Sequence, residues 1–142
     1  MRKLVLLLVA CAALAPGLAL AGGTAKVRLE AKLAGSKETP KGAPAGKGTA
    51  DVTIAGTRVC WQFTYAGLGG KPTAAHIHKG RPGTAGPVVV PLGAAFERRG
   101  CTTASAAVVR AIERSPAAYY VTIHTAKYPG GAIRGQLARA SG

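Results

Sequence analysis

The chain has 142 residues, among them 20 glycines and nine prolines, and a formal net charge of +14. Its length suits one domain with a modest core, and so many turn-forming residues argue against a largely helical protein. The five acidic residues supply no obvious carboxylate pair for glycoside hydrolysis, no Gly-x-Ser-x-Gly motif offers an esterase nucleophile, and no nucleic-acid-binding motif accompanies the basic residues. The charge favours anionic partners such as envelope polymers, although an ordinary solvated basic surface is the simpler explanation.

Residues 1–21 have the pattern of a signal peptide. Two basic residues precede an apolar run over residues 4–15, and Ala19-Leu20-Ala21 forms a small-x-small cleavage site. The run is too short to span a membrane comfortably. We therefore expect a secreted or periplasmic protein that has no transmembrane segment after cleavage. Its mature chain would start at Gly22 and carry a net charge of +12, because two basic residues leave with the leader.

The three cysteines fall into two groups. Residues 8–11, Leu-Val-Ala-Cys, resemble a lipobox, so the alternative to simple cleavage is a lipoprotein anchored through Cys11. Cys60 and Cys101 are the pair that remains after cleavage. An even number of cysteines in an oxidising compartment predicts one disulfide. The alternative use of this pair is a free thiol nucleophile or a metal–thiolate site.

Short stretches of alternating apolar and polar residues recur along the chain, and this period of two is typical of half-buried β-strands. In residues 59–65, for example, Val, Trp, Phe and Tyr occupy one face, and Cys, Gln and Thr occupy the other. Two segments rich in glycine and proline, residues 35–47 and 79–87, predict loops. The predicted strands cover residues 27–33, 50–54, 59–65, 73–78, 88–92, 118–125 and 132–138.

Residues 105–114 are the exception, because their aliphatic residues form one helical stripe. Ser105 suits the N-cap of such a helix, and Pro116 prevents its extension. Seven or more short strands, one short helix and no repeat or linker predict a single all-β domain over residues 22–142. We expect an antiparallel Greek-key sandwich or barrel, similar either to Cu/Zn superoxide dismutase or to an immunoglobulin domain.

All three histidines lie on two of the predicted strands. His76 and His78 flank Ile77, so both imidazoles leave the face of the strand opposite to Ile77. His124 has the same phase on a later strand. If the two strands are neighbours, three ring nitrogens converge into a site that suits copper or zinc. The alternative is that the histidines are polar residues on a solvated sheet face, hydrogen-bonded to the backbone or to threonine hydroxyls.

Two further polar side chains, Arg134 and Gln136, share one face of the last predicted strand and flank Gly135. A glycine inside a strand indicates a bulge or the close approach of another backbone segment. Arg134 and Gln136 are therefore candidates for a polar clamp. The alternative is an ordinary outward-facing pair.

The histidine-bearing segments resemble the CHRD domain family, a module named after chordin that also occurs in exported bacterial proteins. Within residues 26–138, the resemblance rests on an early Glu-x-Pro loop at residues 35–40, a central motif at residues 67–88 and a C-terminal motif at residues 119–137. The family often carries an acidic residue where this chain has Ala132, so any ligand role for that carboxylate is absent. The central motif is also similar to the copper-ligand strand of Cu/Zn superoxide dismutase, but three histidines are too few for a copper–zinc centre.

The resemblance implies an all-β domain and no defined activity, and we assign no catalytic residue. We therefore expect an exported, non-catalytic binding or structural module of the cell envelope or extracellular space. The alternative is a small metal-binding protein in which His76, His78 and His124 hold copper or zinc. This alternative includes a redox-active protein. Convergence of the three histidines distinguishes the two hypotheses.

Overall fold

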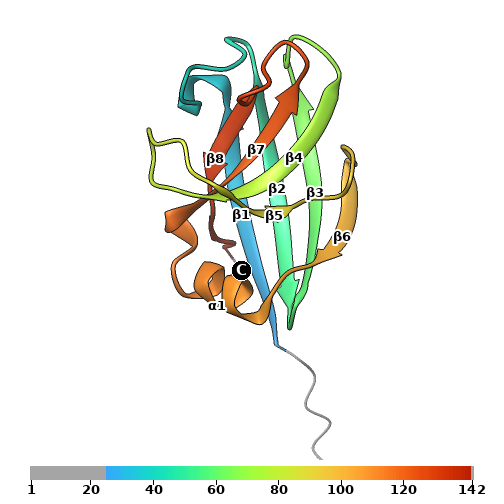
Figure 1. Cartoon of the computed structure of the whole chain (residues 1–142), viewed down its shortest axis with the longest axis vertical. Helices are drawn as coiled ribbons and strands as arrows, with labels where there is room; N and C mark the ends of the chain where they lie inside the picture. Colours follow the sequence, from blue (N-terminus) through green and yellow to red (C-terminus); the bar gives the residue numbers. More distant parts are fainter. Residues whose placement is uncertain (1–24, 142) are drawn as a thin grey trace, which may run out of the picture.

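The strands follow the alternating pattern of the sequence. The computed structural model describes residues 25–141, and β-strands make up about half of this part of the chain (Figure 1). The predicted signal peptide, residues 1–21, and with it Cys11 lie outside the described residues. The strands are β1 (Lys26–Ala34), β2 (Lys47–Ala55), β3 (Arg58–Ala66), β4 (Pro72–Lys79), β5 (Val88–Pro91), β6 (Arg99–Thr103), β7 (Tyr119–Thr125), β8 (Ile133–Gln136) and β9 (Ala138–Arg139).

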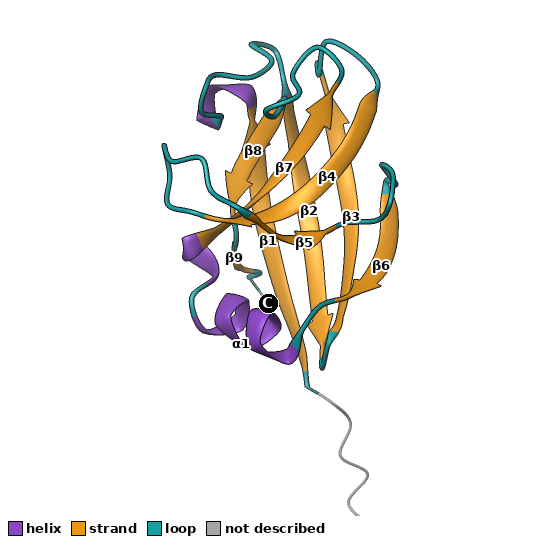
Figure 2. Ribbon diagram, viewed as in Figure 1, coloured by secondary structure: helices purple, strands orange, loops and turns teal. Residues whose placement is uncertain are grey.

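All the strands of residues 25–141 belong to one antiparallel sheet, in the order β5-β4-β7-β8-β1-β2-β3-β6, with β9 paired to β1. The sheet curls so that the half containing β4, β7 and β8 packs over the half containing β1, β2 and β3 (Figure 2). Strand β6 lies beside β3, and β7 lies beside β4, so the first and fourth strands of these two consecutive sets of four are neighbours, as in a Greek key. The all-β Greek-key prediction is confirmed. The immunoglobulin order, in which the second and fifth strands are neighbours, is not the one adopted.

The core lies between the two halves of the sheet. Alternate residues of each strand point into it, so that Leu29, Ile54, Ile77 and Ile123 are each at most 1% exposed. Full burial of an aliphatic side chain of this size contributes roughly 1.5–3 kcal/mol. A slip of β4 by one residue would exchange Ile77 for its polar neighbours, so this burial fixes which face carries the histidines.

One helix, α1 (Ala106–Arg114), closes one end of the sheet (Figure 2). The Ser105 hydroxyl accepts a hydrogen bond of 3.3 Å from the backbone N–H of Val108, and Val109 and Ile112 are buried. The predicted helix and its cap are confirmed. Two short 3₁₀ helices, η1 (Gly35–Lys37) and η2 (Pro116–Ala118), complete the helical structure of the described chain. No helix within residues 25–141 is long and apolar enough to cross a bilayer.

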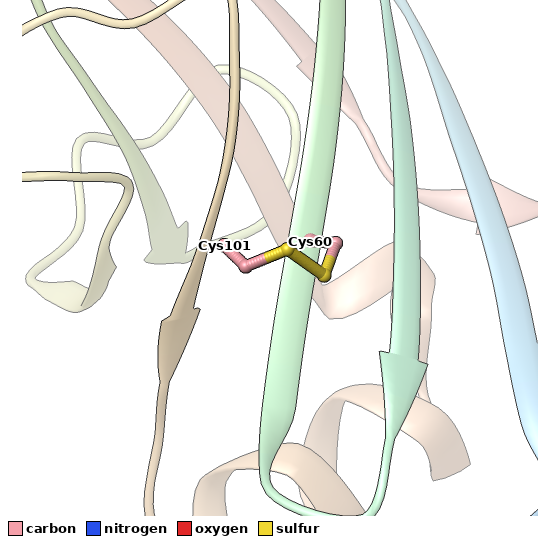
Figure 3. Close-up of a disulfide and its surroundings, with 2 residues drawn as sticks. All are labelled: Cys60 and Cys101. Atoms are coloured by element: carbon pink, nitrogen blue, oxygen red, sulfur yellow. A yellow bond between two sulfur atoms is a disulfide. The ribbon is translucent and has the colours of Figure 1, made fainter.

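Strand β6, which forms an edge of the sheet beside β3, was not predicted from the sequence. Its side chains at Arg99, Cys101 and Thr103 are exposed and Gly100 supplies none, so no apolar alternation marks it. Cys60 and Cys101 are direct partners in the β3–β6 register and form a disulfide (Figure 3). The predicted disulfide is therefore confirmed.

The last predicted strand, residues 132–138, is divided in the structure into β8 and β9. Leu137 separates them, with a buried side chain and a backbone N–H that donates to the carbonyl of Tyr119 at 3.0 Å. Gly135 marks a close approach of backbone, as expected, because a Cβ atom there would collide with the carbonyl of Lys32 on β1. The glycine thus permits β8 to lie against β1.

Candidate metal centre

The polar site lies on the outer face of the half-sheet formed by β4, β7 and β8. In the β4–β7 register, His124 is opposite Ala74 and His76 is opposite Thr122. In the β7–β8 register, Thr122 is opposite Arg134. An outer face usually meets solvent, yet Thr122 and Arg134 are each only 1% exposed. Polar side chains are therefore enclosed here, next to the histidines.

The structure brings the three histidines together. One ring nitrogen from each lies within 4.8 Å of the others, and His76 Nδ1 is 3.1 Å from His124 Nε2. Two nitrogens bound to one tetrahedral ion at 2.0–2.1 Å would be about 3.4 Å apart. The His76–His124 pair already has nearly this separation. All three rings are partly buried, which limits their freedom to turn away.

Backbone carbonyls orient two of the imidazole rings. The Nδ1 atom of His78 lies 2.8 Å from the carbonyl oxygen of Gly86, and that of His124 lies 3.0 Å from the carbonyl oxygen of Pro129. A carbonyl oxygen only accepts hydrogen bonds, so both Nδ1 atoms carry the hydrogen and both Nε2 atoms keep a lone pair, which in His124 accepts the hydrogen bond from His76 Nδ1. This is the usual arrangement of histidines that bind a metal through Nε2.

The surroundings keep the histidines uncharged. Burial, together with the neighbouring His124 and His78, lowers the pKa of His76 from 6.5 to about 4. Burial also lowers the pKa of His78, against the opposing bond to Gly86, and the Arg134 charge lowers it further. The pKa of His124 is lowered by burial and by His78, against its bond to Pro129. Neutral imidazoles at pH 7 are the form that binds metal ions.

Three buried side-chain atoms within residues 25–141 have no hydrogen-bond partner, and they are His78 Nε2, Thr122 Oγ1 and Glu38 Oε1. Thr122 lies opposite His76, and Glu38 contacts Thr122 closely enough for that hydroxyl to influence its pKa. Buried polar atoms without partners are rare, and an absent water or ion often explains them. The unpaired atoms therefore mark the same region as the histidines.

Glu38 is a member of the site that the sequence analysis did not select. It follows η1 in the loop between β1 and β2 and is only 5% exposed. Burial raises the pKa of its carboxyl group from 4.5 to about 7, although Thr122, Arg134 and the Thr39 backbone act in the opposite direction. Gly131 makes room for this carboxyl group, because a Cβ atom at residue 131 would collide with the carboxyl oxygens of Glu38. The φ angle of Gly131 is 137°, a conformation that favours glycine. The sequence signal was only its place in a motif, because nothing local shows that this carboxyl is buried.

Arg134 and Gln136 hold the loop of residues 79–87 against the sheet. The guanidinium of Arg134 donates bonds of 2.7 Å to the carbonyls of Arg81 and Thr84. Gln136 Nε2 donates to the carbonyl of Gly80 at 2.9 Å. The two side chains grip the loop whose Gly86 carbonyl orients His78, so they act on the histidines through the backbone.

Tyr120 links this clamp to the histidines. The guanidinium carbon of Arg134 lies 3.4 Å from the centre of the Tyr120 ring, and the His78 ring stacks on Tyr120 with centroids 4.9 Å apart. The Tyr120 hydroxyl accepts a hydrogen bond of 3.0 Å from the N–H of Gly86. His78 is therefore fixed both by stacking and by the loop.

A groove of about 880 Å³ lies next to this site. It is lined by residues from β1, η1, the following loop and β8, and by Pro82 and Gly83. Glu38, Arg134 and Gln136 border it, but none of the three histidines does. Lys32, Lys37 and Lys41 give its walls a positive charge.

Comparison with known proteins identifies the domain. The family model described as the CHRD domain matches residues 29–137, a span that contains the three histidines, Glu38, Arg134 and Gln136. No curated protein and no solved structure matches the chain.

Proposed function

The chain belongs to the CHRD domain family, and we propose that this member is an exported binding module that holds one copper or zinc ion between His76, His78 and His124. The observation that carries the proposal is the convergence of three neutral imidazoles, two of which have Nδ1 tied to a backbone carbonyl. Imidazole is a good ligand for both metals.

The purely structural alternative accounts for less of the site. It explains the contact between His76 and His124, which share one hydrogen bond. It leaves His78 Nε2 buried and unpaired, at a cost of about 1–3 kcal/mol for a polar atom of this kind. A bound ion would use that lone pair and would replace the hydrogen shared by the other two rings.

Export is the second part of the proposal. The sequence of residues 1–21 supports it, and the Cys60–Cys101 disulfide is consistent with an oxidising compartment. The intact mass of protein recovered from the periplasm or medium should correspond to a chain that starts at Gly22. A mass that includes a diacylglyceryl group on Cys11 would instead make the protein a lipoprotein of the envelope.

Metal binding is tested on untagged mature protein after treatment with a chelator. Calorimetry with Zn²⁺ and Cu²⁺ should show one ion per chain, and elemental analysis should show the same ratio. His78→Ala and His124→Ala should each lower the affinity at least tenfold, about 1.4 kcal/mol, while the circular dichroism spectrum is unchanged. Gln62→Ala, an exposed change on the other half of the sheet, is the control. If the protein takes up neither metal, or if the histidine variants bind metal as tightly as the unchanged protein, only a structural role remains for the histidines.

A further inference from the structure

Thr122 occupies the centre of the polar site. It lies opposite His76 across the β4–β7 ladder and two residues from His124 on the same face of β7, while Arg134 lies opposite it on β8. Its hydroxyl is buried, and the carboxyl group of Glu38 is close enough to act on it as a hydrogen-bond partner. A hydroxyl donates one hydrogen bond and can accept others, so Thr122 can also bind a small polar species beside the histidines.

Glu38 adds a buried carboxyl group from a different part of the chain. It lies within reach of the Thr122 hydroxyl, while its Oε1 atom is buried without a partner. The nearby guanidinium of Arg134 donates to the carbonyls of Arg81 and Thr84. The Thr122 hydroxyl and the Glu38 carboxyl therefore lie together, beside the strand pair that carries His76 and His124.

The three histidines do not complete a coordination shell. Structural zinc sites are closed by four protein ligands, whereas sites with three protein ligands keep a position for water or substrate. Among the described residues, no cysteine, aspartate or glutamate joins the histidine group. The described residues therefore leave the fourth position of an ion held there to water or another small ligand.

We propose that the metal site keeps a fourth position for water or a small anion, and that Thr122, supported by Glu38, holds this ligand by hydrogen bonding. The inference rests on the proposed metal binding. A threonine hydroxyl both donates and accepts, so it can bind either a metal-bound water or a bound anion. The positive charge of Arg134, which reaches His78, together with the charge of the metal ion favours an anion. The site is accordingly an open metal centre that exchanges small anionic ligands.

The test uses mature protein loaded with one equivalent of Cu²⁺, which binds most tightly among the divalent first-row ions. Titration with azide should produce a saturable ligand-to-metal charge-transfer band. Thr122→Val removes the hydroxyl at nearly constant volume and should weaken azide binding about tenfold while copper affinity changes less than twofold. Thr122→Ser, which restores a hydroxyl, should recover most of the azide affinity. Glu38→Gln should weaken azide binding less than Thr122→Val does. Thr103→Val, at an exposed position on β6, is the matched control.

The outcomes separate this inference from the proposed function. A protein that binds one copper ion through the histidines but shows no azide band would overturn the open position and leave metal binding intact. Equal azide affinity in Thr122→Val and the unchanged protein would overturn the role of Thr122. Absence of copper uptake would overturn both proposals. A loss of copper affinity in Thr122→Val that matches its loss of azide affinity would show a structural role for the residue and would also overturn the inference.

Discussion

Burial acts on the titratable side chains of the site in opposite directions. It lowers the pKa of each histidine and raises that of Glu38, because in both cases the charged form is the one disfavoured. For a histidine with a lowered pKa, the contribution to stability is present above pH 6.5 and is lost as the pH falls toward the folded value, which for His76 is about 4. For Glu38 the contribution is present below pH 4.5 and is lost as the pH rises through about 7.

Glu38→Gln should therefore change the stability of the metal-free protein in a pH-dependent way. Glutamine cannot ionise, so the variant avoids a buried carboxylate above pH 7. Between pH 5 and pH 8, its free energy of unfolding should rise relative to the unchanged protein by up to about 3 kcal/mol. Urea denaturation at both pH values measures this difference, and the histidine effects cancel in the comparison. Glu97→Gln, at an exposed position, controls for the loss of one negative charge. A difference that is the same at both pH values would contradict the assignment.

The elements around the site are coupled by hydrogen bonds between a strand and a loop. Strand β8 supplies Arg134 and Gln136, and these hold residues 79–87, which otherwise contain mostly exposed positions. The same loop supplies the Gly86 carbonyl to His78. These hydrogen bonds hold the glycine- and proline-rich loop of residues 79–87 in one conformation. The orientation of His78, a candidate metal ligand, depends on that conformation.

Arg134→Leu should destabilise the protein by about 2–4 kcal/mol, because it removes two hydrogen bonds that a buried charged group donates to the loop carbonyls of Arg81 and Thr84. It should also weaken metal binding, since a loosened loop no longer fixes His78. Arg139→Leu is a matched control, because Arg139 is exposed and makes a single bond of 2.8 Å to the carbonyl of Glu113. Urea denaturation and metal titration of both variants provide the comparison. Equal effects of the two changes would refute the clamp.

In the molecule as a whole, the disulfide and the candidate metal site occupy opposite halves of the folded sheet. The bridge joins β3 to the edge strand β6, whereas the histidines lie on β4 and β7. The strands that carry the two features contribute to one core, but β3 and β6 are not hydrogen-bonded to β4 or β7 in the sheet. They should therefore contribute independently, one to stability and the other to binding.

The double variant Cys60→Ser, Cys101→Ser should be less stable by about 2–4 kcal/mol, because a bridge between residues 41 apart restricts the unfolded chain. Its affinity for metal should match that of the unchanged protein wherever both are folded. Chemical denaturation and calorimetry at a temperature well below the midpoint test the two statements. A metal affinity that falls together with stability would show that the two halves are coupled.

The sequence by itself determined the strands that carry a clear alternation, the capped helix, the disulfide pair and the phase of the histidines. Each of these depends on residues near one another in the chain or on a simple count. Ile77 and Ile123 require burial, and the neighbouring histidines must then point to the other face. Strand β6 could not be predicted in this way, because an exposed edge strand has no apolar face to reveal it.

Only the tertiary structure decided that the outer face of β4, β7 and β8 is covered, and which residues this cover encloses. Glu38 and Thr122 are ordinary polar residues in the sequence, and they become buried because a loop after β1 and a strand near the C-terminus meet. Likewise, Arg134 reaches the carbonyls of Arg81 and Thr84 only because a loop about 50 residues earlier in the chain folds onto it. Burial and hydrogen bonding between distant segments depend on the order of strands in the sheet, and local residue patterns do not carry that information.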